Sequence, residues 1–385
     1  MVKKKVYYIE GDGIGPEITK AMQLVLDQAV QSAYKGQMEL DWRELLAGEK
    51  AKLETGEYLP RQTLDTLQKQ ADVAIKGPLT TPVGEGFRSL NVTLRQIFDL
   101  YACIRPVRHF AGLQTPVKHP EQVDMVVFRE NTEDVYAGLE WQADSPESLK
   151  LIEFLRDELQ ADITPPSGIG IKPISAKCSK RLVRKAVEYA LDKNKPSLTL
   201  MHKGNIMKFT EGAFMRWGYE VLQEEFTGKY ILEEDQQAGQ PNQLLVKNRI
   251  ADNMFQQVLT RPSEYHVIAT TNLNGDYLSD ALAAQVGGLG LAPGANIGDN
   301  LALFEPTHGS VPGRAGTDSA NPGSLILSGA MLLEHIGWQE AAEMVVSGLA
   351  KAISSGRVTG DLARMMPEAT QVGCQEFSTL ICAQI

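Results

Sequence analysis

Short apolar runs that end in polar residues recur along the chain. These β-prone runs are 6–9, 73–75, 125–128, 197–201 and 266–269. Each is followed by glycine, charged or amide residues, and helical spacing of apolar residues fills several intervals, as over 16–30 and 181–191. Strands that alternate with helices predict an α/β fold. Because ligands of such folds bind outside the carboxyl ends of the strands, we expect one composite site there.

The first run is followed by a glycine-rich segment, Gly-Asp-Gly-Ile-Gly at 11–15. A dinucleotide fingerprint needs the spacing G-x-G-x-x-G, so this segment argues against that type of site. A tight turn and a cofactor-facing loop both remain open for it. Pro16 fits the first turn of a helix, where its missing N–H would have no partner in any case.

Two stretches depart from the alternation of strands and helices. Residues 141–173 are the least regular part of the chain and are expected to form an inserted arm. Residues 233–243 are polar enough for a solvated surface loop. No repeat or low-complexity tract is evident, and the length of 385 residues predicts two or three domains.

Composition narrows the class of protein. Hydrophobic residues make up 43% and charged residues 22% of the chain, which is typical of a globular protein. The formal charge of −10 argues against a nucleic-acid partner but allows a local arginine cluster that binds anions. The four cysteines are far apart, and neither a signal segment nor a run of about 18 apolar residues occurs. We therefore expect a cytoplasmic enzyme with free thiols.

Three arginines lie in or beside apolar stretches: Arg95, Arg105 and Arg129. An arginine in such a setting needs an anionic partner, and its planar guanidinium matches a carboxylate with two hydrogen bonds. If the three converge, they would bind a di- or tricarboxylate. The alternative is three separate structural ion pairs, and the residue pattern alone leaves both open.

Acidic residues indicate a possible metal site. Asp276 and Asp280 are four residues apart and share a face if they lie in the first turn of a helix, and Asp252 is a third candidate. Two carboxylates on one face without a basic neighbour are typical of a Mg²⁺ or Mn²⁺ site that substrate oxygens and water complete. The alternative is that they complement the dipole at a helix N-terminus.

Tyr136 and Lys203 each follow a predicted strand. In a polar cleft they could exchange protons with a substrate, although each could equally be an ordinary surface residue. Glycine-rich stretches at 287–298 and 308–316 would let the backbone approach a ligand, with His308 placed to contact a base. The alternative is a turn-rich connection with a structural histidine.

Taken together, the motifs closely resemble those of the isocitrate dehydrogenase branch of the isocitrate/isopropylmalate (β-decarboxylating) dehydrogenase family. The similarity runs from Val6 to about Met366 and includes IEGDGIGPE, FRENTEDVYAGLEW, HKGNIMKFTEGAF and FEPTHGSVPGRAG. It implies a doubly wound α/β fold without the usual dinucleotide fingerprint. The implied parts are a large domain of 1–100 and 287–385, a small dimerisation domain of 101–133 and 176–286, and a clasp-like insertion at 134–175.

The resemblance also implies a function: metal-dependent oxidative decarboxylation of isocitrate to 2-oxoglutarate, as in the tricarboxylic acid cycle, by a homodimer with shared sites. Substrate carboxylates would be bound by Ser89, Asn91, Arg95, Arg105, Arg129 and Asn205. Mg²⁺ or Mn²⁺ would be bound by Asp276, Asp280 and the partner subunit's Asp252. The partner subunit's Lys203 would assist removal of the hydroxyl proton, and Tyr136 would protonate the enol. The cofactor would contact Lys76, Thr80, His308, Gly309 and Asn321.

The cofactor loop departs from the family pattern. NADP enzymes of this branch typically carry Lys-Tyr where this chain has Gly313 and Arg314, and a second tyrosine position is Gly360. The aspartate typical of NAD enzymes is also missing. Arg364 and the partner subunit's Arg261 match the cationic positions that meet the 2′-phosphate, and Arg314 would add a third cation. NADP is therefore expected rather than NAD.

Two alternatives to this function remain, besides the same chemistry with NAD. The enzyme could act on an isocitrate analogue, such as homoisocitrate or a phosphonate counterpart. A non-catalytic regulatory subunit would usually lack the tyrosine, lysine or aspartates named above, and all of them are present.

Overall fold

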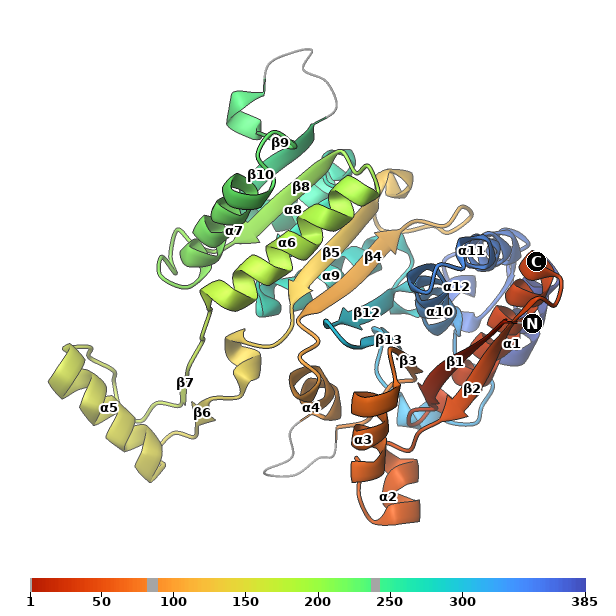
Figure 1. The fold of residues 1–385 in the computed structure, drawn as a ribbon, viewed down its shortest axis with the longest axis horizontal. Helices are drawn as coiled ribbons and strands as arrows, with labels where there is room; N and C mark the ends of the chain where they lie inside the picture. Colours follow the sequence, from red (N-terminus) through yellow and green to blue (C-terminus); the bar gives the residue numbers. More distant parts are fainter. Residues whose placement is uncertain (1, 82–88, 237–242) are drawn as a thin grey trace.

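The computed structural model describes residues 2–81, 89–236 and 243–385 (Figure 1). Within them, one 11-stranded sheet has the strand order β2-β1-β3-β13-β12-β4-β5-β11-β8-β10-β9. Its strands are β1 (Val2–Ile9), β2 (Met38–Glu44), β3 (Val73–Lys76), β4 (Ala102–Arg108), β5 (Asp124–Glu130), β8 (Ser197–His202), β9 (Tyr230–Leu232), β10 (Leu244–Ile250), β11 (Val267–Thr270), β12 (Pro293–Ile297) and β13 (Ala302–Pro306). Two small sheets pair β6 (Glu140–Trp141) with β7 (Ile169–Gly170) and β14 (Arg357–Val358) with β15 (Thr370–Gln371).

The five β-prone runs of the sequence form β1, β3, β5, β8 and β11, and helices lie between them. The α-helices are α1 (Gly15–Tyr34), α2 (Glu49–Thr55), α3 (Arg61–Gln70), α4 (Leu90–Ile97), α5 (Pro146–Leu159), α6 (Ala176–Asp192), α7 (Glu211–Glu225), α8 (Ala251–Thr260), α9 (Asn272–Val286), α10 (Gly323–His335), α11 (Gln339–Ser354), α12 (Gly360–Ala363) and α13 (Cys374–Cys382). The predicted α/β class is confirmed. No helix among the described residues is both long and apolar enough to cross a membrane.

The sheet is mixed, and this changes where its strand ends point. Strands β1, β2, β3 and β13 run parallel to one another, as do β5, β11, β8, β10 and β9. The two groups run in opposite directions because β12 and β4, between them, pair antiparallel with both neighbours. The carboxyl ends of the strands in one group therefore lie at the opposite side of the sheet, along the strand direction, from those in the other group. The expectation of one composite site at a single edge was wrong, and the polar residues meet on one face near the centre of the sheet.

The two faces of the sheet are packed differently. On one face a single apolar cluster extends under α1, α10, α11, α6 and α7 and includes Phe128 and Phe304. On the other face two separate clusters form, one with Leu94 under α3 and α4, the other with Leu282 under α8 and α9. Figure 1 shows α6 in front of the sheet and the fainter α8 and α9 behind it. The gap between the two clusters is where buried polar side chains gather.

The boundary that we expect between the large and small domains falls between β12 and β4. This division into domains stays a prediction. Strands β2, β1, β3, β13 and β12 come from the segments assigned to the large domain. Strands β4, β5, β11, β8, β10 and β9 come from those assigned to the small domain. The gap in the second face thus lies where the two sets of strands meet.

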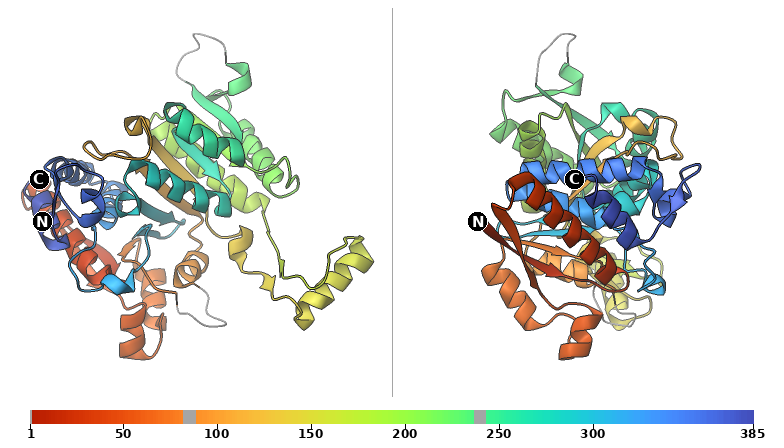
Figure 2. Two further views of the ribbon diagram at one scale, coloured as in Figure 1. Left: turned by 180° about the vertical axis from the view of Figure 1, so that it is seen from behind. Right: turned by 90° about the vertical axis from the view of Figure 1, so that its right-hand side faces the viewer.

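The segment assigned to the clasp projects from the body of the protein in Figure 1 and in the left-hand view of Figure 2. It contains a 14-residue helix, α5, where the sequence predicted only irregular structure. The side chain of Ser145 caps this helix by accepting a hydrogen bond from the N–H of Ser148 (3.1 Å), and Pro146 occupies its first turn. Leu149 and Phe154 on α5 are 44% and 52% exposed, as a clasp between subunits would require. That role stays a prediction.

The predicted surface loop at 233–243 begins with a 3-10 turn, Glu233–Asp235, and residues 237–242 lie outside the described part of the chain.

The glycine-rich segment at 11–15 forms a tight turn between β1 and the start of α1, and this turn is hydrogen-bonded to two other loops. Gly11 and Gly13 have φ of 86° and 60°, in the left-handed region that favours glycine. Between them, the buried carboxylate of Asp12 accepts hydrogen bonds from the N–H groups of Glu49 (2.7 Å) and Thr80 (2.8 Å). The turn interpretation therefore explains the motif without a dinucleotide.

Replacing Asp12 by alanine is expected to lower the free energy of unfolding by about 3 kcal/mol, because two backbone N–H groups lose a charged acceptor. Urea denaturation followed by circular dichroism measures this. Asp12→Asn keeps one acceptor oxygen and should lose less, and Asp41→Ala, on the edge strand β2, should lose little. A D12A protein as stable as the unmodified chain would contradict a stabilising role for the hydrogen bonds from Glu49 and Thr80 to Asp12.

Candidate active site

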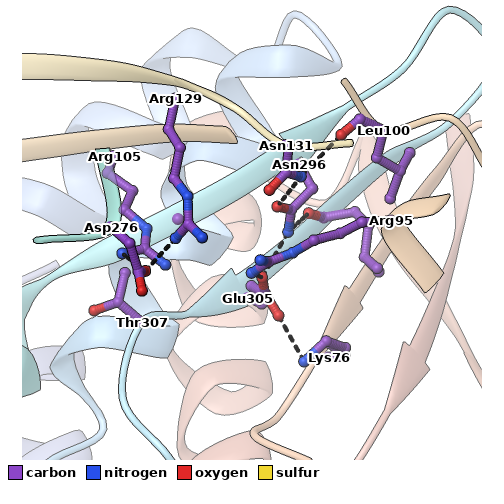
Figure 3. A network of polar contacts seen from close by, with 12 residues as sticks. Lys76, Arg95, Leu100, Arg105, Arg129, Asn131, Asp276, Asn296, Glu305 and Thr307 are labelled. Carbon is purple, nitrogen blue, oxygen red and sulfur yellow. Dashed lines mark hydrogen bonds and ion pairs between the residues drawn. The ribbon is translucent and has the colours of Figure 1, made fainter. Parts of the chain in front are cut away.

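Three arginines converge in the gap between the two apolar clusters (Figure 3). Arg105 on β4 and Arg129 on β5 project from the same face of the sheet, since Arg129 is paired across the strands with Cys103, two residues from Arg105. Arg95 reaches the same region from α4. All three are buried. The arginines thus converge, as one of the two alternatives for them required.

Each arginine is also paired with a carboxylate. Arg129 forms an ion pair with Asp276 on α9, and the Nη1 of Arg105 lies 3.6 Å from the same carboxylate. The Nη2 of Arg95 donates to Glu305 on β13 (2.8 Å). The two alternatives for the arginines are therefore both partly right, because the arginines form one cluster and are also paired with three carboxylates, those of Glu305, Asp276 and Asp280.

Positive charge exceeds negative charge in this cluster. Lys76 at the end of β3 also contacts Glu305, with Nζ 2.6 Å from Oε2, and is 2% exposed. Burial alone would raise the pKa of Glu305, but Lys76 and Arg95 hold it well below its usual range. Burial and the neighbouring Arg105 and Arg95 lower the pKa of Arg129. An anion bound among these cations would relieve that mutual repulsion.

A cavity of about 130 Å³ opens beside the cluster, lined by residues that include Lys76, Asn91, Arg95, Arg105, Glu305 and His308. Three lining residues carry buried atoms without a hydrogen-bond partner among the described residues: Asn91 Oδ1, Arg95 Nε and His308 Nε2. Buried polar groups are almost always paired, so these atoms indicate a place for a polar ligand. A groove of about 590 Å³ lies on the opposite face and is lined by none of the three arginines.

The residues predicted to bind the distal carboxylate lie at the start of α4. Ser89 immediately precedes this helix and its carbonyl accepts a hydrogen bond from the N–H of Thr93 (2.9 Å). Asn91 and Arg95 follow within the helix. Asn91 and Arg95 line the cavity, whereas Ser89 does not.

Tyr136 lies in the short 3-10 turn Asp134–Ala137 and reaches the arginine cluster. Its hydroxyl donates to Asp276 Oδ2 (2.5 Å), and the guanidinium of Arg129 lies 4.8 Å from the centre of its ring. Burial and the contact with Asp276 raise the pKa of Tyr136 to about 12. Burial would raise the pKa of Asp276 as well, but Arg129 and Tyr136 hold it below its usual value. The phenol is therefore protonated at neutral pH.

Asp276 and Asp280 fit part of a divalent-cation site. They lie beyond the first turn of α9, so the helix-dipole interpretation was wrong. A basic neighbour does contact both, because Arg105 Nη1 lies 3.6 Å from Asp276 and 3.3 Å from Asp280. Their oxygens are ligands that Mg²⁺ and Mn²⁺ prefer. The described part of one chain holds no cluster of three His, Cys, Asp or Glu suited to a metal, so a metal bound at these two carboxylates would need further ligands from outside them.

Lys203 and Asp252 contact each other rather than the arginines. The Nζ of Lys203, just after β8, lies 2.5 Å from a carboxylate oxygen of Asp252 in the first turn of α8. The side chain of Asp252 is 70% exposed. Asn205, in the turn after Lys203, is exposed too. Among the described residues no hydrogen bond or ion pair joins this group to the arginine cluster, as expected if it serves the site of another subunit.

Of the residues predicted to bind the cofactor, Lys76, His308 and Gly309 line the same cavity, whereas Thr80 and Asn321 do not. Thr80 Oγ1 lies 2.7 Å from Ser310 Oγ, which joins the loops after β3 and β13. His308 and Gly309 line the cavity, and burial lowers the pKa of His308. The amide of Asn321 donates to Asp361 (2.9 Å).

The three arginines expected to meet the 2′-phosphate, Arg261, Arg314 and Arg364, are all exposed. At Gly313 a side chain would enter open space, whereas at Gly360 a Cβ would lie 2.9 Å from the side chain of Gln371. The second tyrosine of the family pattern therefore has no room here unless Gln371 moves.

Sequence reasoning missed the residues that organise the cluster: Glu305, Asn131 and Asn296. Glu305 stands as a lone acid in the apolar run of β13, which was a usable signal, since a buried acid needs cationic partners. The asparagines gave no signal because an amide pair can be recognised only once the two strands are neighbours. Asp361, beside Asn321, was missed for the same reason.

A buried, cation-rich pocket at the centre of a mixed α/β sheet, beside a protonated phenol and a pair of carboxylates, defines an enzyme site for a small polyanion. Residues 5–381 match the family described as isocitrate/isopropylmalate dehydrogenase, and the chain belongs to this family. The resemblance seen in the sequence motifs is thereby confirmed.

Several similar proteins that are named isocitrate dehydrogenases support the assignment to this family. The chain is 53% identical over 391 residues to an isocitrate dehydrogenase (NADP) of Helicobacter pylori, covering 97% of this chain and 91% of that protein. It is 54% identical over 389 residues to one of Pseudomonas aeruginosa (98% and 92% covered). It is 55% identical over 380 residues to one of Archaeoglobus fulgidus (97% and 91%). The solved isocitrate dehydrogenase of Methylococcus capsulatus is 37% identical with a TM-score of 0.80, covering 100% of this chain and 99% of that one.

Proposed function

We propose that the chain catalyses the oxidative decarboxylation of isocitrate to 2-oxoglutarate and CO₂, with hydride transfer to NADP. The observation that carries this proposal is the convergence of Arg95, Arg105 and Arg129 beside a buried cavity in which cations outnumber carboxylates. A tricarboxylate supplies the missing negative charge. The NADP isocitrate dehydrogenases that share more than half of this sequence support the same assignment.

In this proposal each group of residues has its own role in the reaction. When bound, Mg²⁺ or Mn²⁺ polarises the substrate hydroxyl and its neighbouring carboxylate, and NADP accepts the hydride. The arginines hold the substrate carboxylates and so fix the reacting carbon. The partner subunit's Lys203 assists loss of the hydroxyl proton, and Tyr136 donates a proton to the enol after CO₂ leaves. One proton leaves and one is returned, so the net change is CO₂ release and reduction of NADP.

The active unit in this proposal is a homodimer. Lys203 and Asp252 are paired with each other away from the arginines, and α5 carries exposed apolar side chains on a projecting arm. Both features are accounted for if a second copy brings Lys203 and Asp252 to the site of the first. The cytoplasmic location remains a prediction from the sequence.

The substrate is tested by initial rates with isocitrate, homoisocitrate and isopropylmalate at saturating NADP and Mg²⁺. We expect isocitrate to be preferred, because the polar side chains of Ser89 and Asn91 suit a distal carboxylate and not an alkyl group. Preference for homoisocitrate would mean that this analogue, and not isocitrate, is the substrate. Preference for isopropylmalate would contradict the assignment of the α4 residues.

Removing the cationic side chains of Arg314 and Arg364 together is expected to raise KM for NADP by about 100-fold, because each contributes charge-assisted hydrogen bonds to the 2′-phosphate. The KM for NAD, which lacks that phosphate, should change little. Arg61→Ala on α3 serves as the exposed-arginine control. An equal loss with both cofactors would contradict the role of these arginines in NADP selectivity.

A further inference from the structure

A chain of buried amide hydrogen bonds leads away from the arginine cluster (Figure 3). Asn296 on β12 donates through Nδ2 to Glu305 Oε1 (2.6 Å). Asn131, directly after β5, donates through Nδ2 to Asn296 Oδ1 (2.9 Å) and to the carbonyl of Leu100 (2.8 Å). Both asparagines are buried. None of the catalytic roles proposed above uses either of them.

The direction of these hydrogen bonds is fixed by chemistry. A Glu305 carboxylate paired with two cations can only accept, so Asn296 must present its NH₂ group to it. The carbonyl oxygen of Asn296 then points away and needs a donor, which Asn131 supplies. The amide of Asn131 therefore sets the orientation of the amide of Asn296, which in turn fixes one oxygen of Glu305.

The chain of hydrogen bonds spans the boundary between the two sets of strands in the sheet. Strand β4 lies between β12 and β5, so the Asn131–Asn296 contact passes over one strand and joins the two sets of strands. Asn131 is two residues after Arg129, and Glu305 holds both Arg95 and Lys76. The amides thus connect Arg129 on one side of the gap with Arg95 and Lys76 on the other.

We propose that Asn131 and Asn296 are positioning residues, which act through Glu305 to hold Arg95 and Lys76 in register with Arg129. The inference rests on the proposed function, in which the arginines hold isocitrate and Lys76 borders the nicotinamide. Register between these groups sets the alignment of the reacting carbon with its hydride acceptor. Misalignment of about 1 Å costs roughly a hundredfold in rate, so the amides should affect the hydride step more than ligand binding.

The test uses leucine, which has nearly the shape of asparagine and no polar atoms. Asn296→Leu and Asn131→Leu are each expected to lower kcat by about 100-fold, with less than about a fivefold change in either KM. The isotope effect on kcat with isocitrate deuterated at the carbinol carbon should rise, because hydride transfer becomes limiting. The double variant should be no slower than Asn296→Leu, because the two amides act in series. Gln285→Leu removes a buried amide elsewhere, on α9, and should leave both kcat and the isotope effect unchanged.

Circular dichroism and thermal unfolding show whether the variants fold, and Asn296→Ala replaces Asn296→Leu if the larger side chain prevents folding. Unchanged kcat, an unchanged isotope effect, or losses that multiply in the double variant would each overturn the positioning role. Absence of turnover in the unmodified protein is a different failure, because it removes the proposed function and this inference with it.

Discussion

Replacing Asp276 by asparagine is expected to lower kcat/KM for isocitrate by about 10²–10³-fold, with the fold intact. The side chain keeps its shape but loses the charge that pairs with Arg129 and Arg105 and that would bind Mg²⁺. Its NH₂ group would also face a donor, either a guanidinium or the hydroxyl of Tyr136. The loss should therefore appear both in turnover and in the Mg²⁺ concentration needed for half-maximal rate.

Initial rates over a range of Mg²⁺ concentrations measure this effect. Asp41, a partly exposed aspartate on β2 that pairs with Arg43, provides the matched control, and Asp41→Asn should behave as the unmodified protein. A D276N enzyme with normal rates and a normal Mg²⁺ requirement would remove Asp276 from the metal site and leave it as a structural partner of the arginines.

The second large effect concerns the shared site. Tyr136→Phe and Lys203→Met are each expected to lower kcat by about 10²–10⁴-fold, since each removes one proton-transfer group. If each site takes Tyr136 from one subunit and Lys203 from the other, a mixed dimer of the two variants has one intact site. Co-expression in equal amounts should then restore about a quarter of full activity, because half of the dimers are mixed and each has one working site of two.

Co-expression of two differently tagged chains and purification of the mixed dimer provide the measurement, and the purified mixed dimer should have about half of full activity because one of its two sites is intact. Tyr136→Phe co-expressed with Tyr136→Phe, also differently tagged, is the control and should stay inactive. A mixed dimer as inactive as its parents would mean that Tyr136 and Lys203 of one chain belong to the same site, or that the chain acts as a monomer.

Much of the fold could be predicted from the sequence because its strands are buried on both faces. The run of β3, for example, is apolar from Val73 to Ile75 and ends abruptly in Lys76, which identifies the strand and its end together. The reversal of direction between the two halves could not be predicted in this way. Local patterns mark where strands are, whereas the antiparallel pairing of β12 with β4 depends on contacts between residues almost two hundred positions apart.

The site shows the same division between local and long-range information. Arg95, Arg105 and Arg129 were recognisable because charge inside apolar stretches demands a partner. Their actual partners, Glu305 and Asp276, come from distant strands and helices and appear only in the folded chain. The helix α5 was missed although a Ser-Pro cap preceded it, because the surrounding prolines and glycines dominated the pattern.

The assignment of Asp252 and Lys203 to a partner's site illustrates what the family resemblance adds. Nothing in their sequence spacing indicates that they serve another subunit, and in the single chain they simply form an ion pair. The co-expression experiment therefore tests a claim that neither local pattern nor the geometry of one chain could make alone.

The most direct test of the account follows NADPH formation by the purified protein with isocitrate, NADP and Mg²⁺, together with the amount of 2-oxoglutarate produced. We predict equal amounts of NADPH and 2-oxoglutarate, loss of the reaction on adding a chelator, and its return with excess Mg²⁺ or Mn²⁺. NADPH without 2-oxoglutarate would contradict the decarboxylation step. No reaction with isocitrate under any of these conditions would contradict the assignment of the arginine cluster as an isocitrate site.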